Sequence, residues 1–158
     1  IMNANDTITQ PFMSISTSTL ELNIDNVCFN STANNTKLLP AHLTIQSINL
    51  KGFMNRIVFD LSSNTVANTI LCATMEDNST LDINKITIFS GIDTPVNPSE
   101  NLFYFLSKNG PSSGAKISIS DLVFSGVMPG YKPSNPMSLF TFEQLGTISL
   151  KDLDIQAQ

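Results

Sequence analysis

Residues 117–126 of this chain read Ile-Ser-Ile-Ser-Asp-Leu-Val-Phe-Ser-Gly, and this stretch contains the pattern that decides the fold. Apolar and polar residues alternate on each side of a polar pair, Ser120-Asp121. Each half is therefore typical of a short strand with one buried face. Because the extra residue between the halves resets the phase, both apolar pairs face inward only if the chain bends at the polar pair.

The same pattern, apolar–x–apolar–x–x–apolar–x–apolar, occurs five times along the chain. The copies span residues 22–29, 43–50, 81–88, 117–124 and 148–155. Polar residues, mostly of types that suit a turn, stand at every bend: Asp25-Asn26, Gln46-Ser47, Asn84-Lys85, Ser120-Asp121 and Lys151-Asp152. A recurring unit that cannot bury its own apolar face predicts a solenoid, in which stacked copies bury that face together.

Equivalent positions of the copies should form continuous columns in the interior. One such column is predicted to consist of Ile24, Ile45, Ile83, Ile119 and Leu150. Short aromatic or β-branched runs precede most copies, at residues 12–15, 57–61, 102–105 and 139–142, and an extra strand is expected at 69–73. Each rung should then combine an aromatic strand, a variable loop and a bent double strand, which gives an all-β parallel β-helix (β-solenoid) of about five rungs.

A β-sandwich is the alternative, because its half-buried strands also alternate and recur at short intervals. A sandwich does not require the same pattern five times with the phase break in the same place. The repeated break therefore favours the solenoid.

The segments 81–91 (Leu-Asp-Ile-Asn-Lys-Ile-Thr-Ile-Phe-Ser-Gly) and 117–126 resemble rungs of right-handed parallel β-helices of the pectin-lyase-like superfamily. The resemblance covers roughly residues 12–156. It implies the fold more than the function, since the superfamily includes polysaccharide lyases and hydrolases, phage tailspikes, autotransporter passengers and protist surface proteins.

Length and composition indicate one domain over residues 1–158, with 41% hydrophobic content to supply one core. Neither end shows an obvious polar cap, so the chain is expected to be a fragment of a longer solenoid or to stack on a neighbour. The regions 12–27 and 139–155 should make that contact, either with another copy or with another chain. A head-to-tail contact of this kind would build a filament.

The charge of the chain excludes several partners. The net charge is −5 and there are only eight Lys and Arg residues, without a cluster that could neutralise nucleic-acid phosphates. No apolar run approaches the roughly 18 residues that a membrane span needs. We therefore expect no nucleic-acid binding and no membrane insertion.

Four N-x-[ST] sequons mark candidate glycosylation sites at Asn5, Asn30, Asn34 and Asn78. The last three fall in predicted loops, where a glycan could project, which favours a secreted or cell-surface protein. Cys28 and Cys72 are the only cysteines and are candidates for one disulfide, with two unpaired thiols as the alternative.

Candidate catalytic residues are scarce. Arg56 is the single arginine and His42 the single histidine, and we expect an ion-paired or solvated role for the first and a strand-capping role for the second. Asp25, Asp121 and Asp152 stand at bends and could form an acidic stripe for Ca²⁺, although Asp also suits a bend for purely structural reasons. We expect no catalytic residues, no metal and no cofactor.

The sequence thus predicts a non-enzymatic, extracellular or cell-surface structural or adhesive module. Its rungs would form a rigid rod, while loops at 30–40, 62–68, 91–101 and 129–137 display glycans or contact partners. The alternative is a carbohydrate-active β-helix that binds or cleaves polysaccharides.

Overall fold

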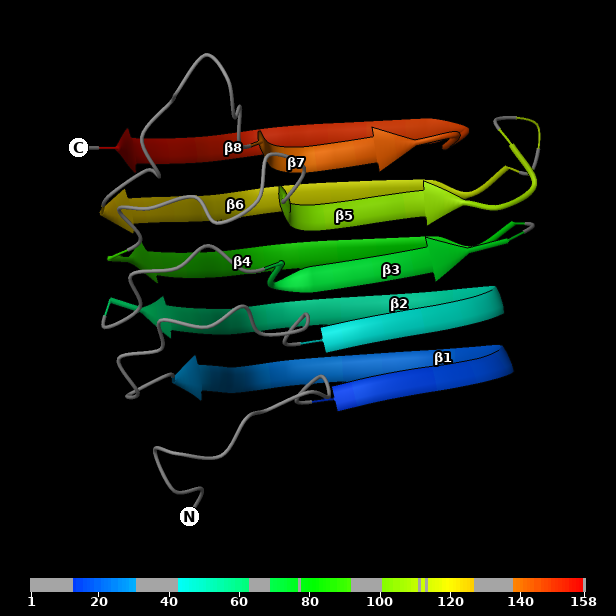
Figure 1. Ribbon diagram of the computed structural model, residues 1–158, viewed down its shortest axis with the longest axis horizontal. Helices are drawn as coiled ribbons and strands as arrows, with labels where there is room; N and C mark the ends of the chain where they lie inside the picture. Colours follow the sequence, from blue (N-terminus) through cyan, green and yellow to red (C-terminus); the bar gives the residue numbers. More distant parts are fainter. Residues whose placement is uncertain are drawn as a thin grey trace.

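The computed structural model shows a parallel β-solenoid, as the sequence predicts (Figure 1). It describes residues 13–30, 43–62, 69–76, 78–91, 101–110, 112, 114–126 and 138–157. Within these residues there is no helix long and apolar enough to cross a membrane.

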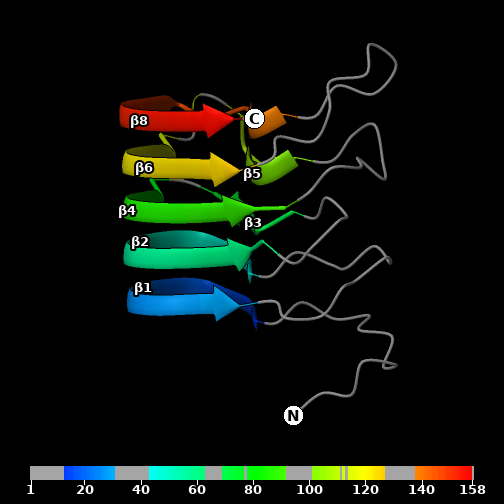
Figure 2. The same cartoon turned by 90° about the vertical axis from the view of Figure 1, so that its left-hand side faces the viewer.

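Eight strands form one sheet, and all paired neighbours in it run parallel. They are β1 (Met13–Asn30), β2 (Leu43–Leu61), β3 (Leu71–Met75), β4 (Thr80–Ser90), β5 (Asn101–Ser107), β6 (Lys116–Gly126), β7 (Ser138–Glu143) and β8 (Thr147–Ala157). Figures 1 and 2 show them stacked as successive layers, with β1 at one end and β7 and β8 at the other.

We number the layers from this first strand. Layer 1 is β1 and layer 2 is β2, whereas layers 3, 4 and 5 each consist of two strands: β3 with β4, β5 with β6, and β7 with β8. The first part of β2 pairs with β3 and its second part with β4, so a long bent strand and a strand pair are equivalent layers.

The five layers amount to about three turns of the solenoid, against the roughly five rungs counted in the sequence. Layers 2 to 4 have a paired layer on both sides, whereas layers 1 and 5 pair on one side only among the described strands. The sequence pattern cannot distinguish a terminal layer from an internal one, because both carry the same apolar alternation.

A bend at a residue with positive φ divides the second part of every layer. The five residues at these bends are Asn26, Arg56, Lys85, Asp121 and Asp152, with φ between 52° and 58°. The left-handed conformation inserts the extra residue of the pattern and returns the next apolar side chain to the interior. Four of the five bends lie where the sequence placed them.

The second copy of the repeat was placed wrongly. The β1–β2 and β2–β4 pairing puts Met54 between Ile24 and Ile83, so the interior column is Ile24, Met54, Ile83, Ile119 and Leu150. Ile45 belongs to a different column, between Ile15 and Ala73.

Gly52 explains the error. It occupies the first apolar position of the true second copy, residues 52–59, next to Leu22 on one side and Leu81 on the other. A Cβ atom at this position would lie 2.6 Å from Leu81 Cδ1, so the neighbouring leucine fills the space that a side chain would need. The run 43–50 resembles a copy by chance, and its Ile48 is 49% exposed instead of buried.

The aromatic runs in β5 and β7 behave as expected. Phe103 and Phe105 of β5 are fully buried, and their rings lie 5.3 Å and 5.5 Å from Phe140 and Phe142 of β7. The strand expected near 69–73 is β3, which opens layer 3. Residues 57–61 do not precede a copy; they form the end of β2.

Candidate functional site

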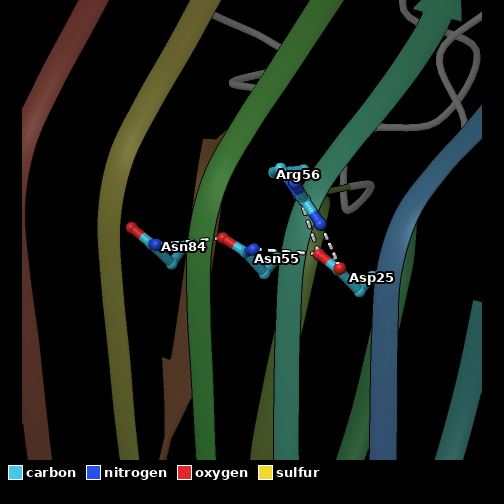
Figure 3. Close-up of polar contacts among 4 residues, drawn as sticks. All are labelled: Asp25, Asn55, Arg56 and Asn84. Atoms are coloured by element: carbon cyan, nitrogen blue, oxygen red, sulfur yellow. Dashed lines mark hydrogen bonds and ion pairs between the residues drawn. The ribbon is translucent and has the colours of Figure 1, made fainter.

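One corner of the solenoid carries a ladder of hydrogen-bonded polar side chains, shown in part in Figure 3. Asn55 Nδ2 donates to Asp25 Oδ1 at 2.9 Å, and Asn84 Nδ2 donates to Asn55 Oδ1 at 3.0 Å. Ser120 Oγ donates to Asn84 Oδ1 at 3.0 Å. We call Asp25, Asn55, Asn84 and Ser120 the corner ladder. It joins layers 1 to 4 through residues that are 29 to 36 positions apart in sequence.

The corner ladder begins at an ion pair. Arg56 donates to both carboxylate oxygens of Asp25, through Nε at 3.0 Å and through Nη2 (Figure 3). The hydrogen bond from Arg56 is the main reason why the pKa of Asp25 lies below its ordinary value of 3.8. Arg56 therefore has the ion-paired role expected from the sequence.

The acidic stripe proposed for Ca²⁺ is not assembled. Asp25 lies in layer 1 and is neutralised by Arg56, whereas Asp121 and Asp152 lie in layers 4 and 5. Asp121 and Asp152 are neighbours at the bend, but the layers that carry Asn55, Arg56, Asn84 and Lys85 separate them from Asp25, so the three carboxylates do not converge. In the described part of the chain, no group of three or more His, Cys, Asp or Glu residues could hold a metal ion.

A second corner contains a polar groove of about 270 Å³. We call it the corner groove, and its lining residues are Ser16, Thr17, Ser18, Gln46, Ser47, Ile48, Glu76 and Lys108. Lys108 Nζ and Glu76 Oε1 are 3.5 Å apart. The groove thus combines hydroxyl groups, an amide, one ion pair and one exposed apolar side chain.

Two buried serines at this corner differ in their hydrogen bonding. Ser79 Oγ accepts from the Leu50 amide at 2.9 Å and contacts the carbonyl oxygens of Ile48 and Glu76, so it satisfies the corner backbone. Ser47 is 3% exposed, lines the groove, and its Oγ has no hydrogen-bond partner among the described residues. A buried hydroxyl without a partner is rare and costs free energy.

The last layer presents apolar side chains to solvent. Ile148, Leu150 and Ile155 of β8 are 44%, 44% and 46% exposed, although they occupy inward positions of the repeat. Leu153 of β8 and the two phenylalanines of β7 are only partly buried against the core. We call this set the open face: Phe140, Phe142, Ile148, Leu150, Leu153 and Ile155.

Two of the four sequons can be placed. Asn30, which was predicted to lie in a loop, is instead the exposed last residue of β1 and pairs with Asp60 of β2. Asn78 is exposed at a turn with φ of 55°. Asn5 and Asn34 lie outside the described residues, as do His42 and almost all of the four loops expected to contact partners. Glycosylation at these positions stays a prediction.

The two cysteines are free thiols. Cys28 lies beside Val58 at the end of layers 1 and 2, whereas Cys72 lies beside Thr44 at the start of β2. The expected disulfide is therefore not formed in this structure. Burial raises the pKa of the Cys72 thiol, which lowers its reactivity.

Sequence reasoning found the bend residues but missed what they contact. Three features depend on which layers are neighbours: the corner ladder, the pairing of Arg56 with Asp25, and the position of Ser47. Because the second copy was misplaced, the sequence could not predict them.

Comparisons with family models, curated proteins and solved structures gave no match for this chain.

Proposed function

We propose that this chain is a non-enzymatic structural or adhesive module of a secreted or cell-surface protein. The observation that supports this most strongly is the corner ladder. Its polar side chains form hydrogen bonds from each layer to the next, and the apolar side chains of the core pack against one another between the same layers. These contacts between successive layers make the stack rigid, as in repeat proteins whose repeats contact only their neighbours.

Three further features support an extracellular setting. Asn30 and Asn78 of the sequons are exposed, the share of charged residues is 13%, and the segments 81–91 and 117–126 resemble rungs of the pectin-lyase-like superfamily, which includes surface proteins as well as enzymes. A β-solenoid with variable loops suits display, because the stack fixes loop positions without depending on loop sequence.

Secretion of the chain from eukaryotic cells tests this proposal. We expect a glycosidase-sensitive shift in electrophoretic mobility that becomes smaller in Asn30→Gln and smaller again in Asn30→Gln/Asn78→Gln. The purified protein should release no fragments from a panel of acidic and neutral polysaccharides. Turnover of any of these polysaccharides, or secretion of a misfolded chain without glycan, would contradict the proposal.

A carbohydrate-binding role is the second candidate, and the corner groove favours it. Hydroxyl and amide groups beside an exposed Ile48 offer both polar and apolar contacts to a sugar ring, and the Ser47 hydroxyl lacks a partner. Calorimetric titration with oligosaccharides tests this role. Binding that Gln46→Ala and Glu76→Ala both weaken, and that Ser149→Ala on the far strand β8 leaves unchanged, would support it.

A further inference from the structure

We propose that the open face of layer 5 binds layer 1 of a second copy of this chain, so that copies stack head to tail. This inference rests on the proposed structural role and names its partner. Three observations carry it: the exposure of the open face, the agreement in register between layers 1 and 5, and the distribution of charges on the two layers.

The open face has the properties of an internal layer without its neighbour. Leu150 is 44% exposed, whereas Ile119, its register partner in β6, is 1% exposed. The same holds for Ile148 beside Ile117, and for Ile155 beside Phe124. Apolar side chains that gather in this way on a surface mark an interaction site. No described strand pairs with the outer edge of β8, so backbone groups are available there as well.

Layer 1 supplies a matching surface in the same register. Its outer edge also pairs with no described strand. Met13 at its start is 36% exposed and Ile15, Leu22 and Val27 are partly buried, whereas Ile24 and Phe29 are only 8% and 5% exposed, so layer 1 is less open than layer 5. Following the columns from layer to layer assigns a layer 1 residue to each apolar residue of the open face. The assigned pairs are Phe140 with Met13, Phe142 with Ile15, Ile148 with Leu22, Leu150 with Ile24, Leu153 with Val27, and Ile155 with Phe29. Every pair is apolar.

The charges on the two layers fit the same register. Lys151 continues the column of the corner ladder beyond Ser120, and Asp25 begins that column in the next copy. The other charged residues of these two layers face neutral ones: Asp152 faces Asn26, Asp154 faces Cys28, Glu143 faces Ser16, and Glu21 faces Thr147. Stacking therefore brings Lys151 beside Asp25, which Arg56 of its own copy already pairs, and places no like charges opposite each other.

Contact between two open faces is less favourable. It would bring both copies of Glu143, Asp152 and Asp154 into one interface, against two copies of Lys151. A head-to-tail contact separates these carboxylates and repeats without closing, so it produces linear oligomers that grow with concentration.

Two variants of the full 158-residue chain test the inference by sedimentation velocity. Leu150→Glu places a charge on the open face, and Val27→Glu places one on layer 1. We expect the unmodified chain to form linear oligomers as its concentration rises, and each variant alone to associate at least tenfold more weakly. An equimolar mixture should form a 1:1 heterodimer that does not grow, because one intact interface remains between the two variants.

The controls separate the alternatives. Ser149→Glu adds the same charge to the outward side of β8 and should leave association unchanged. If Val27→Glu lowers the melting temperature, Met13→Glu takes its place as the layer 1 variant.

A dimer of Val27→Glu alone would overturn the inference in favour of contact between open faces. A folded unmodified chain that stays monomeric at all concentrations would also overturn it. That result leaves the structural role in place, whereas polysaccharide turnover would contradict the role and not the stacking.

Discussion

Strands β6 and β8 carry the same repeat in the same register, yet their side chains have opposite environments. Ile117, Ile119 and Phe124 of β6 are at most 1% exposed, whereas the corresponding residues of β8 are at least 44% exposed. The strands differ in their neighbours, since β6 lies between β4 and β8 while β8 pairs only with β6 among the described strands. For these two strands, burial therefore follows the number of adjacent layers and not the sequence of the strand itself.

The largest expected effect comes from placing a charge at equivalent positions of the two strands. Ile119→Asp puts an unpaired carboxylate into the closed interior and should lower the free energy of unfolding by roughly 4 kcal/mol. Leu150→Asp, at the register partner of Ile119, should cost about 1 kcal/mol or less in the dilute monomer, because its carboxylate reaches water. Urea denaturation of both variants measures the difference.

If Ile119→Asp does not fold, Ile119→Ala and Leu150→Ala provide the same comparison. The first should cost about 2–4 kcal/mol and the second well under half of that. Equal costs at the two positions would show that layer 5 is covered in solution.

The two buried serines of the second corner provide the next test. Ser79→Ala removes a hydroxyl that binds the Leu50 amide and two carbonyl oxygens, and it should cost about 1–3 kcal/mol. Ser47→Ala removes a buried hydroxyl without a described partner, and it should leave stability unchanged or raise it by about 0.5 kcal/mol. Thermal unfolding measures both variants. A clear loss in Ser47→Ala would mean that this hydroxyl is satisfied in solution.

A smaller effect is expected along the first corner. Asn84→Ala interrupts the corner ladder in the middle, where Asn84 donates to Asn55 and accepts from Ser120, and should cost about 1–2 kcal/mol. Lys151→Ala alters the end of the same column, where the lysine forms an exposed ion pair with Asp152 at 3.5 Å, and should cost at most about 0.5 kcal/mol. If urea denaturation gives similar losses of stability for Asn84→Ala and Lys151→Ala, the hydrogen bonds of Asn84 to both neighbouring layers do not stabilise the fold.

The sequence was sufficient for the fold class because the apolar alternation and its phase break survive in four of the five layers. It failed at layer 2, where Gly52 replaces an apolar residue and Leu81 of the next layer fills the space. A pattern search cannot see a side chain supplied from a neighbouring layer. The sequence also predicted Phe103 and Phe105 in the interior, since aromatic alternation is a local property.

The contacts of the corner ladder could not be predicted from the sequence for a related reason. Asp25 was recognised as a bend residue, but its partners Asn55 and Arg56 lie 30 and 31 positions away. Only the correct register of layers 1 and 2 brings them together. Likewise, the exposure of Leu150 cannot be predicted from a repeat in which it matches the buried Ile119.

The smallest expected effect is a pH dependence at the exposed end of the ladder. Because the pKa of Asp25 is lowered in the folded state, its ionised carboxylate stabilises the fold above the ordinary pKa of 3.8. This contribution disappears as the pH falls through the lower pKa of the folded state. The melting temperature of the unmodified chain should exceed that of Asp25→Asn near neutral pH, and the difference should vanish near pH 2. A difference that persists in acid would assign the effect to hydrogen bonding and not to charge.

Amide hydrogen exchange on β6 and β8 tests whether each layer depends on its neighbour and whether layer 5 is open. In dilute solution, we expect strong protection of β6 and rapid exchange at alternate residues of β8, whose amides face the outer edge. At concentrations where copies associate, protection should rise in β8 and β1 and stay constant in β6. Protection of β8 equal to that of β6 in the dilute monomer would show that layer 5 is closed without a second copy.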